Sequence, residues 1–519
     1  MKETPRDSHI NSQKSHTEDR EKNASIIVDN EGDYNPSCDK KNTKFIYSPE
    51  EKRLLRKINI TTVPFICSIA FLQYIDKIIL NFSTVIGLFD DTGIDGNQFS
   101  WVASIFFFGY LLFQIPNQYL MQKFPISKYL GTFLILWGVN LGCTALASNF
   151  SQLLALRFLQ GFFEAAAYPC IQILYSTIYR RQEQVVLFGI MLITNDVGFA
   201  FGGLVGYGFL NLDGAYGLRG WKWCMIILGC VTVGMGIATF FFLPDTPKSR
   251  WFRLTHEQST IVDDRLRDNQ LVPNKVVNFN HIWESLKEAR LYCYFLICIL
   301  INLEHGCLSI FSTMIIKTMG FSDMAAILLN IPLAFASILT TATAIYFSHR
   351  YNENGYVGAV ACIVGLLGVL LLTVLPTGGV QLIGLYLTSI GGAYTIGLTM
   401  ISNNVCGYTK KIFYNGTYIT AYCLGCFLGP LMMRENEAPR YLSGMIGYIV
   451  GMLIAAVLFL YLRWSYARDN QYRLRLKAEN KLIEAPSSLP SFVKNQEQQQ
   501  TIAEKDTTDR QNLHFLYRP

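Results

Sequence analysis

The sequence has few charged residues and lacks the motifs of several enzyme and pump classes. Only 16% of its 519 residues are Asp, Glu, Lys or Arg, whereas 51% are hydrophobic. We find no phosphate-binding glycine loop, which disfavours an ATP-driven pump. We also find no Ser-His-Asp or metalloprotease signature, which disfavours a hydrolase. Scarce charge and abundant apolar residues in so long a chain are typical of a membrane protein with many spans, so we expect no enzyme.

The cysteines do not indicate a metal or redox centre. Most of the 13 cysteines lie within or beside apolar stretches, where cysteine serves as a small hydrophobic residue. Cys423 and Cys426 have the spacing of a redox or zinc motif, but no βαβ pattern and no second pair of metal ligands accompanies them. We therefore expect neither a metal nor an organic cofactor. The net charge of +6 comes from tails and loops, so it indicates topology and not binding to nucleic acid.

The first half of the chain predicts six membrane spans behind a polar tail. Residues 1–57 lack the apolar core of a cleaved signal peptide, and we expect them to be disordered. Apolar runs follow near 58–82, 99–121, 128–147, 151–178, 184–211 and 221–243. Basic residues precede the first run, and the loop after it is acidic, with Asp90, Asp91 and Asp95. Positive charge marks the cytosolic side, so we expect the N-terminus in the cytosol.

The second half repeats this pattern after a charged linker. Residues 244–290 interrupt the hydrophobicity, and further apolar runs lie near 291–317, 323–348, 356–375, 379–405, 413–433 and 441–465. Residues 466–519 form a second polar tail. The pattern predicts an all-α membrane transporter with six-helix bundles at 58–243 and 291–465. The linker and both termini are expected in the cytosol.

One span carries two charges of opposite sign. The run LLALRFLQGFFEAAAYPCIQILYSTIYRR contains Arg157 and, seven residues later, Glu164. Seven residues are close to two helical turns, so both should lie on one face, about 10 Å apart along the axis. Ionisable groups inside a span usually face a protein-lined interior and mark an ion or substrate path. Arg157 could instead reach the interface, and Glu164 could simply bond a neighbouring helix.

A second charged pair, Asp76-Lys77, lies in the outer half of the first span, with Tyr74 just before it. A carboxylate in a poorly solvated cavity can take up a proton near the working pH, and a cation there can pair with an anionic substrate. The pair could also be an interfacial anchor. The sequences YIDKIILNFST and LEHGCLSIFST form a faint internal echo, which would place Asp76 and Glu304 at comparable depth on opposite sides of one cavity.

Four further polar residues in spans are weaker candidates for the substrate path: Asn195, Glu304, His305 and Asn403. For each of them, lining the path and packing between helices remain equal alternatives.

Several segments together resemble the fungal allantoate permease family, a branch of the anion:cation symporters in the major facilitator superfamily. They are GYLLFQIPNQYLMQKFP, RFLQGFFEAAAYP, FLPDTPKSRWF, GYTKK and GPLMMRENEAPRY, and the similarity runs from about residue 58 to 465. The resemblance implies twelve membrane helices, alternating access, and uptake of a small organic anion such as a ureidoacid, a vitamin acid or an amino-acid derivative. A proton gradient would supply the energy.

The resemblance also implies roles for individual residues. Asp76, Arg157 and Glu164 match positions that serve proton coupling and carboxylate binding, and Tyr74 matches an aromatic residue before the acid. Lys77 stands where bacterial members have Arg, which keeps the charge but loses bidentate recognition of a carboxylate. The resulting hypothesis is that Asp76 and Glu164 take up protons while Lys77 and Arg157 attract the anion.

Two alternatives stay open at this stage: a nutrient sensor that keeps a transporter fold, and a proton-independent facilitator. We expect a monomer that contacts lipid, protons and a small anion but no nucleic acid. The plasma membrane is the default location, with the endoplasmic reticulum or another internal membrane as the alternative.

Overall fold

The computed structural model describes residues 48–519 except 122, 180, 250, 251, 253, 270–277, 389, 390, 439, 479–507, 513 and 514. Most of the two expected tails therefore lies outside the described residues. The part from Glu50 to Pro519 forms one compact unit. Its described residues contain helices and no strands, as the sequence predicts.

The helices of the first half form what we call the N-terminal bundle. It contains α2 (Pro49–Ser83), α4 (Gly96–Leu120), α5 (Ile126–Thr144), α6 (Phe150–Glu164), α7 (Ala167–Ile178), α8 (Arg181–Leu210) and α9 (Gly220–Phe242). The short α3 (Leu88–Thr92) connects α2 to α4. Within the bundle α5 packs along α9, and α4 packs along α6. The fourth expected span corresponds to α6 and α7 together.

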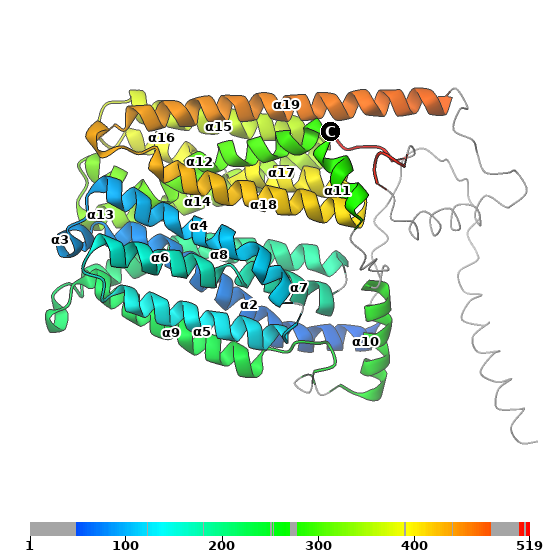
Figure 1. Cartoon of the computed structure of the whole chain (residues 1–519), viewed down its shortest axis with the longest axis horizontal. Helices are drawn as coiled ribbons and strands as arrows, with labels where there is room; N and C mark the ends of the chain where they lie inside the picture. The colour runs from blue at the N-terminus through cyan, green and yellow to red at the C-terminus, as the bar shows by residue number, and fades with distance from the viewer. Residues whose placement is uncertain are drawn as a thin grey trace, which may run out of the picture. The chain divides into compact units, whose positions relative to one another are not determined.

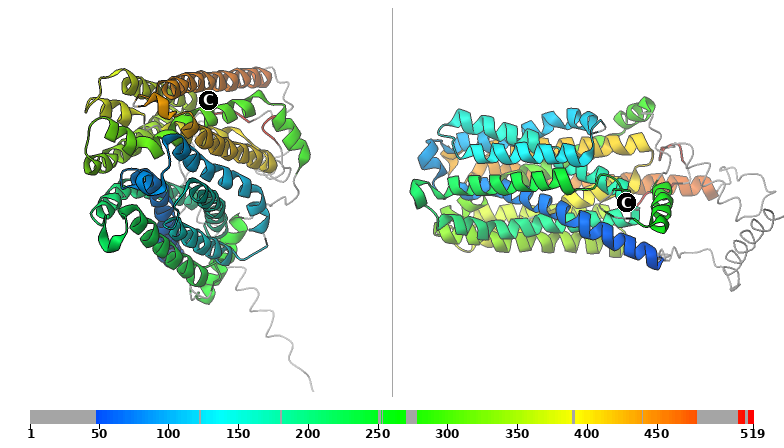
Figure 2. Two further views of the ribbon diagram at one scale, coloured as in Figure 1. Left: turned by 60° about the vertical axis from the view of Figure 1, so that its left-hand side comes forward. Right: turned by 90° about the horizontal axis from the view of Figure 1, so that it is seen from below.

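The C-terminal bundle has the same plan. It contains α12 (Ala289–Thr318), α13 (Asp323–Leu328), α14 (Asn330–Tyr351), α15 (Asn354–Val374), α16 (Gln381–Leu387), α17 (Gly391–Asn404), α18 (Tyr408–Leu431) and α19 (Leu442–Ala478). Two surface helices, α10 (His256–Asn269) and α11 (Phe279–Leu286), lie in the linker between the bundles. Figures 1 and 2 show the two groups of helices side by side.

The first span begins earlier than its apolar run. Helix α2 starts at Pro49, so the end of the segment expected to be a disordered tail is helical. The local sequence explains this start, because proline suits the first helical position and Glu50 and Glu51 complement the positive end of the helix dipole. Leu54 and Ile58 are fully buried and attach this turn to the bundle.

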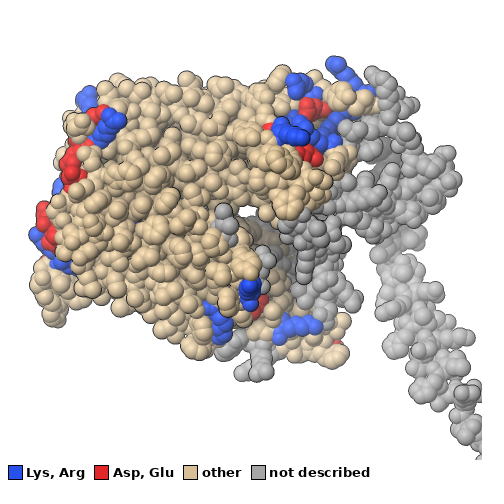
Figure 3. Space-filling model, viewed as in Figure 1, with Lys and Arg blue, Asp and Glu red and all other residues tan. Residues whose placement is uncertain are grey.

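The distribution of apolar and charged residues fits a membrane-spanning unit. Eight of the described helical segments are long and apolar enough to cross a membrane. On the face in Figure 3, Lys, Arg, Asp and Glu gather at the two ends and leave an uncharged band between them. We call the end where α2 begins and α19 ends the tail side, and the opposite end, where α2 ends and α4 begins, the far side.

Contacts between the bundles close the far side. Helix α4 packs against α18, and α8 packs against α13 and α14. At the far side the main-chain nitrogen of Gly96 donates to Glu435 Oε2 at 2.9 Å, and the hydroxyl of Ser100 donates to the Met433 carbonyl at 3.4 Å. Toward the tail side the surface between the two bundles is hollowed (Figure 3).

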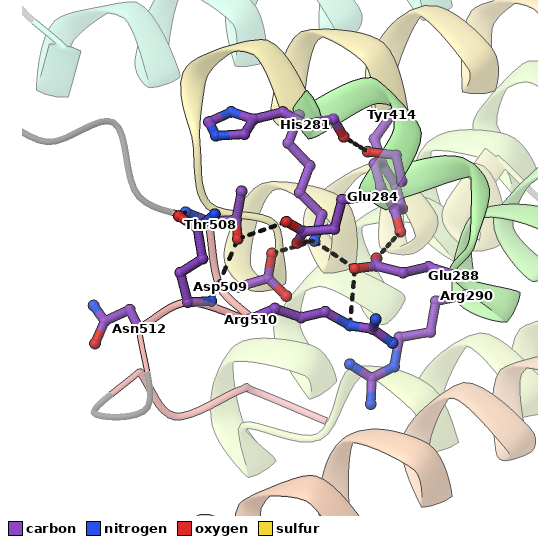
Figure 4. A network of polar contacts seen from close by, with 12 residues as sticks. His281, Glu284, Glu288, Arg290, Tyr414, Thr508, Asp509, Arg510 and Asn512 are labelled. Carbon is purple, nitrogen blue, oxygen red and sulfur yellow. Dashed lines mark hydrogen bonds and ion pairs between the residues drawn. The ribbon is translucent and has the colours of Figure 1, made fainter. Parts of the chain in front are cut away.

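The end of the chain docks on the tail side of the C-terminal bundle (Figure 4). Lys410 at the start of α18 has no exposed side-chain surface, and its Nζ lies 2.9 Å from Glu284, 2.6 Å from Glu288 and 2.8 Å from Asp509. Thr508 Oγ1 donates to Glu284 Oε2 at 3.2 Å. The segment expected to be a plain polar tail thus ends in a docked stretch, because Asp509 supplies one of the three carboxylates around a buried cation.

Further along, Tyr517 attaches the same stretch to α19. Its hydroxyl accepts from Arg473 Nη2 at 2.9 Å and donates to Asp509 Oδ2 at 2.8 Å. Burial and the Asp509 carboxylate raise the pKa of Tyr517 well above its usual range, so the hydroxyl keeps the proton that it donates. The main-chain oxygen of Pro519 accepts from the nitrogen of Asn354, the first residue of α15.

Candidate functional site

The charged span of the sequence buries its charges on one face, as the spacing predicts. In α6 the buried residues are Leu153, Arg157, Gln160, Gly161 and Glu164, which recur every one to four positions. The Asn149 side chain begins the helix by accepting from the nitrogen of Gln152 at 3.0 Å. A Cβ at Gly161 would lie 1.9 Å from the Phe106 carbonyl, so only glycine lets this face approach α4.

Glu164 is the most enclosed acid of this face. Its side chain has no exposed surface, and Oε1 lies 3.1 Å from Lys77 Nζ and accepts from Gln73 Nε2 at 2.8 Å. Its second oxygen, Oε2, has no hydrogen-bond partner among the described residues. Lys77 in α2 and Glu164 in α6 therefore form an ion pair, and Glu164 Oε2 remains available to accept a hydrogen bond.

Asp76 faces away from its neighbour Lys77. Adjacent residues on a helix point about 100° apart, and Asp76 points to α5 and α6 of its own bundle. Its Oδ2 accepts from Trp137 Nε1 at 2.8 Å and from Gln160 Nε2. The internal repeat of YIDKIILNFST and LEHGCLSIFST suggested that Asp76 and Glu304 face each other across one cavity. Asp76 instead lies inside the N-terminal bundle, with only 1% of its surface exposed.

Arg157 is a buried cation between these two acids. It is 2% exposed and interacts electrostatically with both Asp76 and Glu164. Its Nε and Nη2 atoms have no hydrogen-bond partner among the described residues. A buried guanidinium with unused donors is costly, so it favours an arrangement in which a carboxylate reaches it.

Aromatic rings surround the ammonium group of Lys77. Its Nζ lies 5.8 Å from the centre of the Phe106 ring and 5.9 Å from that of Tyr168, distances at which a cation is attracted to a ring face. The Tyr168 hydroxyl accepts a hydrogen bond from Asn195 Nδ2 at 2.9 Å. Asn195, a candidate from the sequence, is therefore linked to Lys77 through Tyr168.

Tyr74 lies near the same cation. It lies three residues before Lys77 in α2, so the two residues are neighbours on the helix surface, and its ring centre is 5.8 Å from that of Phe199 in α8. The side chain of Lys77 is itself 25% exposed, in contrast to the enclosed acid that it pairs with.

The three candidate residues of the C-terminal bundle, Glu304, His305 and Asn403, lie in different places. His305 is close enough to Lys77 to interact with it electrostatically. Glu304 points elsewhere, into its own bundle, where it lies near Thr388. Asn403 is half-buried at the tail-side end of α17, beside Asn404, whose side chain bonds the main chain of Arg518 at 2.9 and 2.7 Å. The structure thus places His305 within electrostatic range of Lys77 and leaves Glu304 and Asn403 outside the charged group.

Sequence reasoning missed five neighbours of the charges: Gln73, Phe106, Trp137, Gln160 and Tyr168. Helical spacing could have found three of them, because Gln73 lies four residues before Lys77, Gln160 four residues before Glu164 and Tyr168 four residues after it. Phe106 and Trp137 come from other helices, and nothing in their local sequence distinguishes them.

The charged cluster consists of Asp76, Lys77, Arg157 and Glu164, and its four charges sum to zero when all are ionised. An anion that joins Lys77 would make the cluster negative, and a proton on Glu164 would restore neutrality. The arrangement can therefore bind an anion and a proton together at low electrostatic cost. No group of three or more His, Cys, Asp or Glu is placed to hold a metal ion among the described residues.

Comparisons with known proteins agree with this architecture. Residues 66–430 match the family model described as Major Facilitator Superfamily. An uncharacterized transporter of Schizosaccharomyces pombe is 31% identical, with 90% of this chain and 89% of the relative covered. The thiamine pathway transporter of Saccharomyces cerevisiae is 30% identical over 81% of each chain, and the allantoate permease of that yeast is 28% identical over 91% and 87%.

Solved structures show the same fold at low sequence identity. A D-xylose-proton symporter superposes with a TM-score of 0.60 at 14% identity and covers 78% of this chain and 97% of its own. A bacterial homologue of the human lysosomal transporter Spinster, inward-facing and unoccupied, has a TM-score of 0.58 at 15% identity, with 78% and 95% covered. The protein is thus a multi-pass membrane transporter and not an enzyme. It belongs to the Major Facilitator Superfamily and, within it, to the fungal allantoate permease family that its motifs indicate.

Proposed function

We propose that this transporter is a proton-coupled symporter for a small organic anion that carries a carboxylate. The observation that carries the proposal is the ion pair between Lys77 and Glu164, in which a partly exposed cation is held by a fully enclosed acid. A substrate carboxylate and Glu164 would compete for the same ammonium group.

Proton uptake would decide this competition. When Glu164 is ionised, it holds Lys77 and an incoming anion is repelled by the acid. When Glu164 is protonated, Lys77 is released and pairs with the substrate carboxylate. One proton and one monovalent anion then leave the charge of the cluster unchanged, so the loaded carrier would cross its transition without moving net charge. The proton gradient supplies the energy, and no further cofactor is needed.

Arg157 would stabilise the cluster while Lys77 is occupied by substrate. Its free Nε and Nη2 donors are available to Asp76 or to a second polar group of the substrate. Tyr74, Tyr168 and His305 would contact the body of the substrate. The Tyr168 ring centre lies 5.9 Å from Lys77 Nζ, Tyr74 lies three residues before Lys77 in α2, and His305 is within electrostatic range of Lys77. Asn195 would act through Tyr168 by holding its hydroxyl.

Charge asymmetry supports an orientation for this carrier. The far side carries Asp90, Asp91 and Asp95, whereas Lys410 and Lys411 lie on the tail side. Because positively charged loops usually stay in the cytosol, the tail side and both termini would lie there, with the far side outside the cell. We propose the plasma membrane as the location and a monomer as the working unit, because one chain supplies the whole charged cluster.

The names of similar proteins support the substrate class and the coupling. An allantoate permease is named for an organic anion, and one transporter of the same fold is named for its proton symport. The charged cluster described above offers this chain the means for both.

The test of the proposal is Glu164→Gln in liposomes that hold the purified protein. This variant should lose substrate accumulation driven by a pH gradient, because Lys77 is permanently released, while it still exchanges substrate across the membrane. Glu304→Gln is the matched control, since Glu304 is an equally buried span acid that lies outside the cluster. Full accumulation by Glu164→Gln would overturn the proposed coupling and favour a proton-independent facilitator.

A further inference from the structure

The echoed Phe-Ser-Thr motif marks a contact between the two bundles. Asn81 directly precedes the first copy in α2, and Ser312 and Thr313 belong to the second copy in α12. Asn81 Nδ2 donates to Ser312 Oγ at 2.8 Å and to the Ser309 carbonyl at 3.3 Å, and Oδ1 accepts from the nitrogen of Thr313 at 3.1 Å. Asn81 has no exposed surface and lies two residues from the far-side end of α2.

The donor and the acceptor of the Asn81 carboxamide each pair with one backbone group of α12. Ser309 and Thr313 are four residues apart, so the carbonyl of one and the nitrogen of the other are the partners of a single helical hydrogen bond. A side chain must supply both a donor and an acceptor at close range to bridge them. A carboxamide does this without a charge and through two separate atoms, an NH₂ donor and a carbonyl acceptor, and the side chain of Asn spans the present distances.

A second asparagine fixes the partners of this contact. Ser312 Oγ donates to Asn330 Oδ1 at 2.6 Å, and Asn330 Nδ2 donates to Thr313 Oγ1 at 3.0 Å and to the Ala326 carbonyl at 2.8 Å. Asn330, Ser312 and Thr313 have no exposed surface. The C-terminal bundle therefore presents a preformed polar socket, and Asn81 is the residue from the other bundle that fills it.

We propose that Asn81 is the far-side latch of this transporter, the residue whose bonds to α12 hold the far side closed. The inference rests on the alternating-access part of the proposed function, since opening the far side must pull α2 away from α12. Separation would take the Asn81 carboxamide away from all three of its bonds, and a buried carboxamide without partners is costly away from water. Asn81 thus sets the balance between the closed and open far side without touching the charged cluster.

The test compares Asn81→Asp with Asn117→Asp in the full-length protein. Aspartate has nearly the shape of asparagine but, when ionised, cannot donate to Ser309 or Ser312. Asn117 is the matched control, because it is also fully buried and uses both ends of its carboxamide. Its Nδ2 donates to the Ala165 carbonyl at 3.1 Å and its Oδ1 accepts from Tyr129 at 2.8 Å, all within the N-terminal bundle.

The measurement is the far-side distance between the bundles without substrate, in lipid nanodiscs. Spin labels on ketone-bearing amino acids at Tyr216 and Val380, which are 95% and 52% exposed, leave the native cysteines untouched. We expect Asn81→Asp to raise the ratio of long to short distances about tenfold, the effect of losing roughly two buried hydrogen bonds. Asn117→Asp should leave the distance distribution as in the wild type.

An unchanged distribution in folded Asn81→Asp, or an equal change in both variants, would overturn the latch. Asn81→Ala, which removes the bonds without adding charge, replaces Asn81→Asp if the aspartate variant does not fold. The readout uses neither substrate nor a pH gradient, so a failure of the symport proposal would leave this result interpretable. Conversely, a failed latch would leave the coupling experiment on Glu164 unaffected.

Discussion

Lys77 and Glu164, which lie 87 positions apart in the sequence, meet with Nζ and Oε1 at 3.1 Å inside the N-terminal bundle. The two partners differ in exposure, because a quarter of the Lys77 side chain is exposed whereas Glu164 is fully enclosed. A solute can therefore approach the cation without first reaching the acid. In the proposed function, this asymmetry would let the pair switch between proton and anion instead of serving only as a structural ion pair.

Two substitutions of Lys77 should distinguish the effect of its positive charge on substrate binding from the effect of its side-chain shape. We expect Lys77→Met to weaken substrate binding about tenfold or more, because a charge-assisted bond contributes roughly 1.5–3 kcal/mol. Lys77→Arg should keep much of the affinity, since it preserves the charge near Phe106 and Tyr168. Equilibrium binding of the transported anion measures both. Wild-type affinity in Lys77→Met would show that the anion binds elsewhere.

Asp76 and Arg157 should behave as coupled charges. Asp76→Asn or Arg157→Gln alone leaves one buried charge without compensation, whereas the double variant removes both. We expect the double variant to be more stable than the sum of the single effects by about 1–3 kcal/mol. Unfolding of the purified proteins in detergent gives the three values. If the stability changes of the two single variants simply add up in the double variant, Asp76 and Arg157 do not interact energetically.

The second bundle should contribute to binding through His305 and not through Asn403. His305→Phe should change the apparent substrate affinity by about three- to tenfold, since a ring contact near Lys77 is worth roughly 0.5–1.5 kcal/mol. Asn403→Ala should leave the affinity within about twofold, because Asn403 lies at the tail-side end of α17. Uptake at varied substrate concentration tests both. A larger effect at Asn403 than at His305 would place the substrate path nearer the tail side.

The docked end of the chain should stabilise the C-terminal bundle. Lys410→Met would remove the buried ammonium that Glu284, Glu288 and Asp509 share and leave only the more exposed Arg510 beside Glu288. Removing one partner of a buried pair costs about 3–5 kcal/mol. Lys411→Met is the matched control, because the neighbouring Lys411 bonds the Ser402 carbonyl at an exposed site. Thermal unfolding should show a clear loss for the first variant and little change for the second. Equal curves would mean that the network does not support the fold.

Local sequence periodicity predicts the helices and one face of the site well. Hydrophobic runs locate the spans, and a seven-residue spacing places Arg157 and Glu164 on one buried face of α6. Both depend only on neighbours along one helix. The allantoate permease motifs likewise identify the family, because they are local segments.

Contacts between helices could not be predicted in the same way. Trp137 meets Asp76 across 61 residues of sequence, and the direction in which Asp76 points depends on how α2 rotates against α5 and α6. The neighbours Glu304 and His305 diverge for the same reason. The docking of Asp509 on Lys410 depends on a tertiary contact, which a polar tail composition does not reveal.

The most direct test of the account is proton flux in liposomes holding the purified transporter, challenged with a panel of small carboxylates. The panel should include allantoate, nicotinate, pantothenate, biotin and simple monocarboxylates. We expect one class of anion to drive protons into the liposomes and make the external medium more alkaline, and we expect Glu164→Gln to abolish this signal. Transport of an anion without any accompanying proton movement would contradict the exchange of Lys77 between Glu164 and substrate.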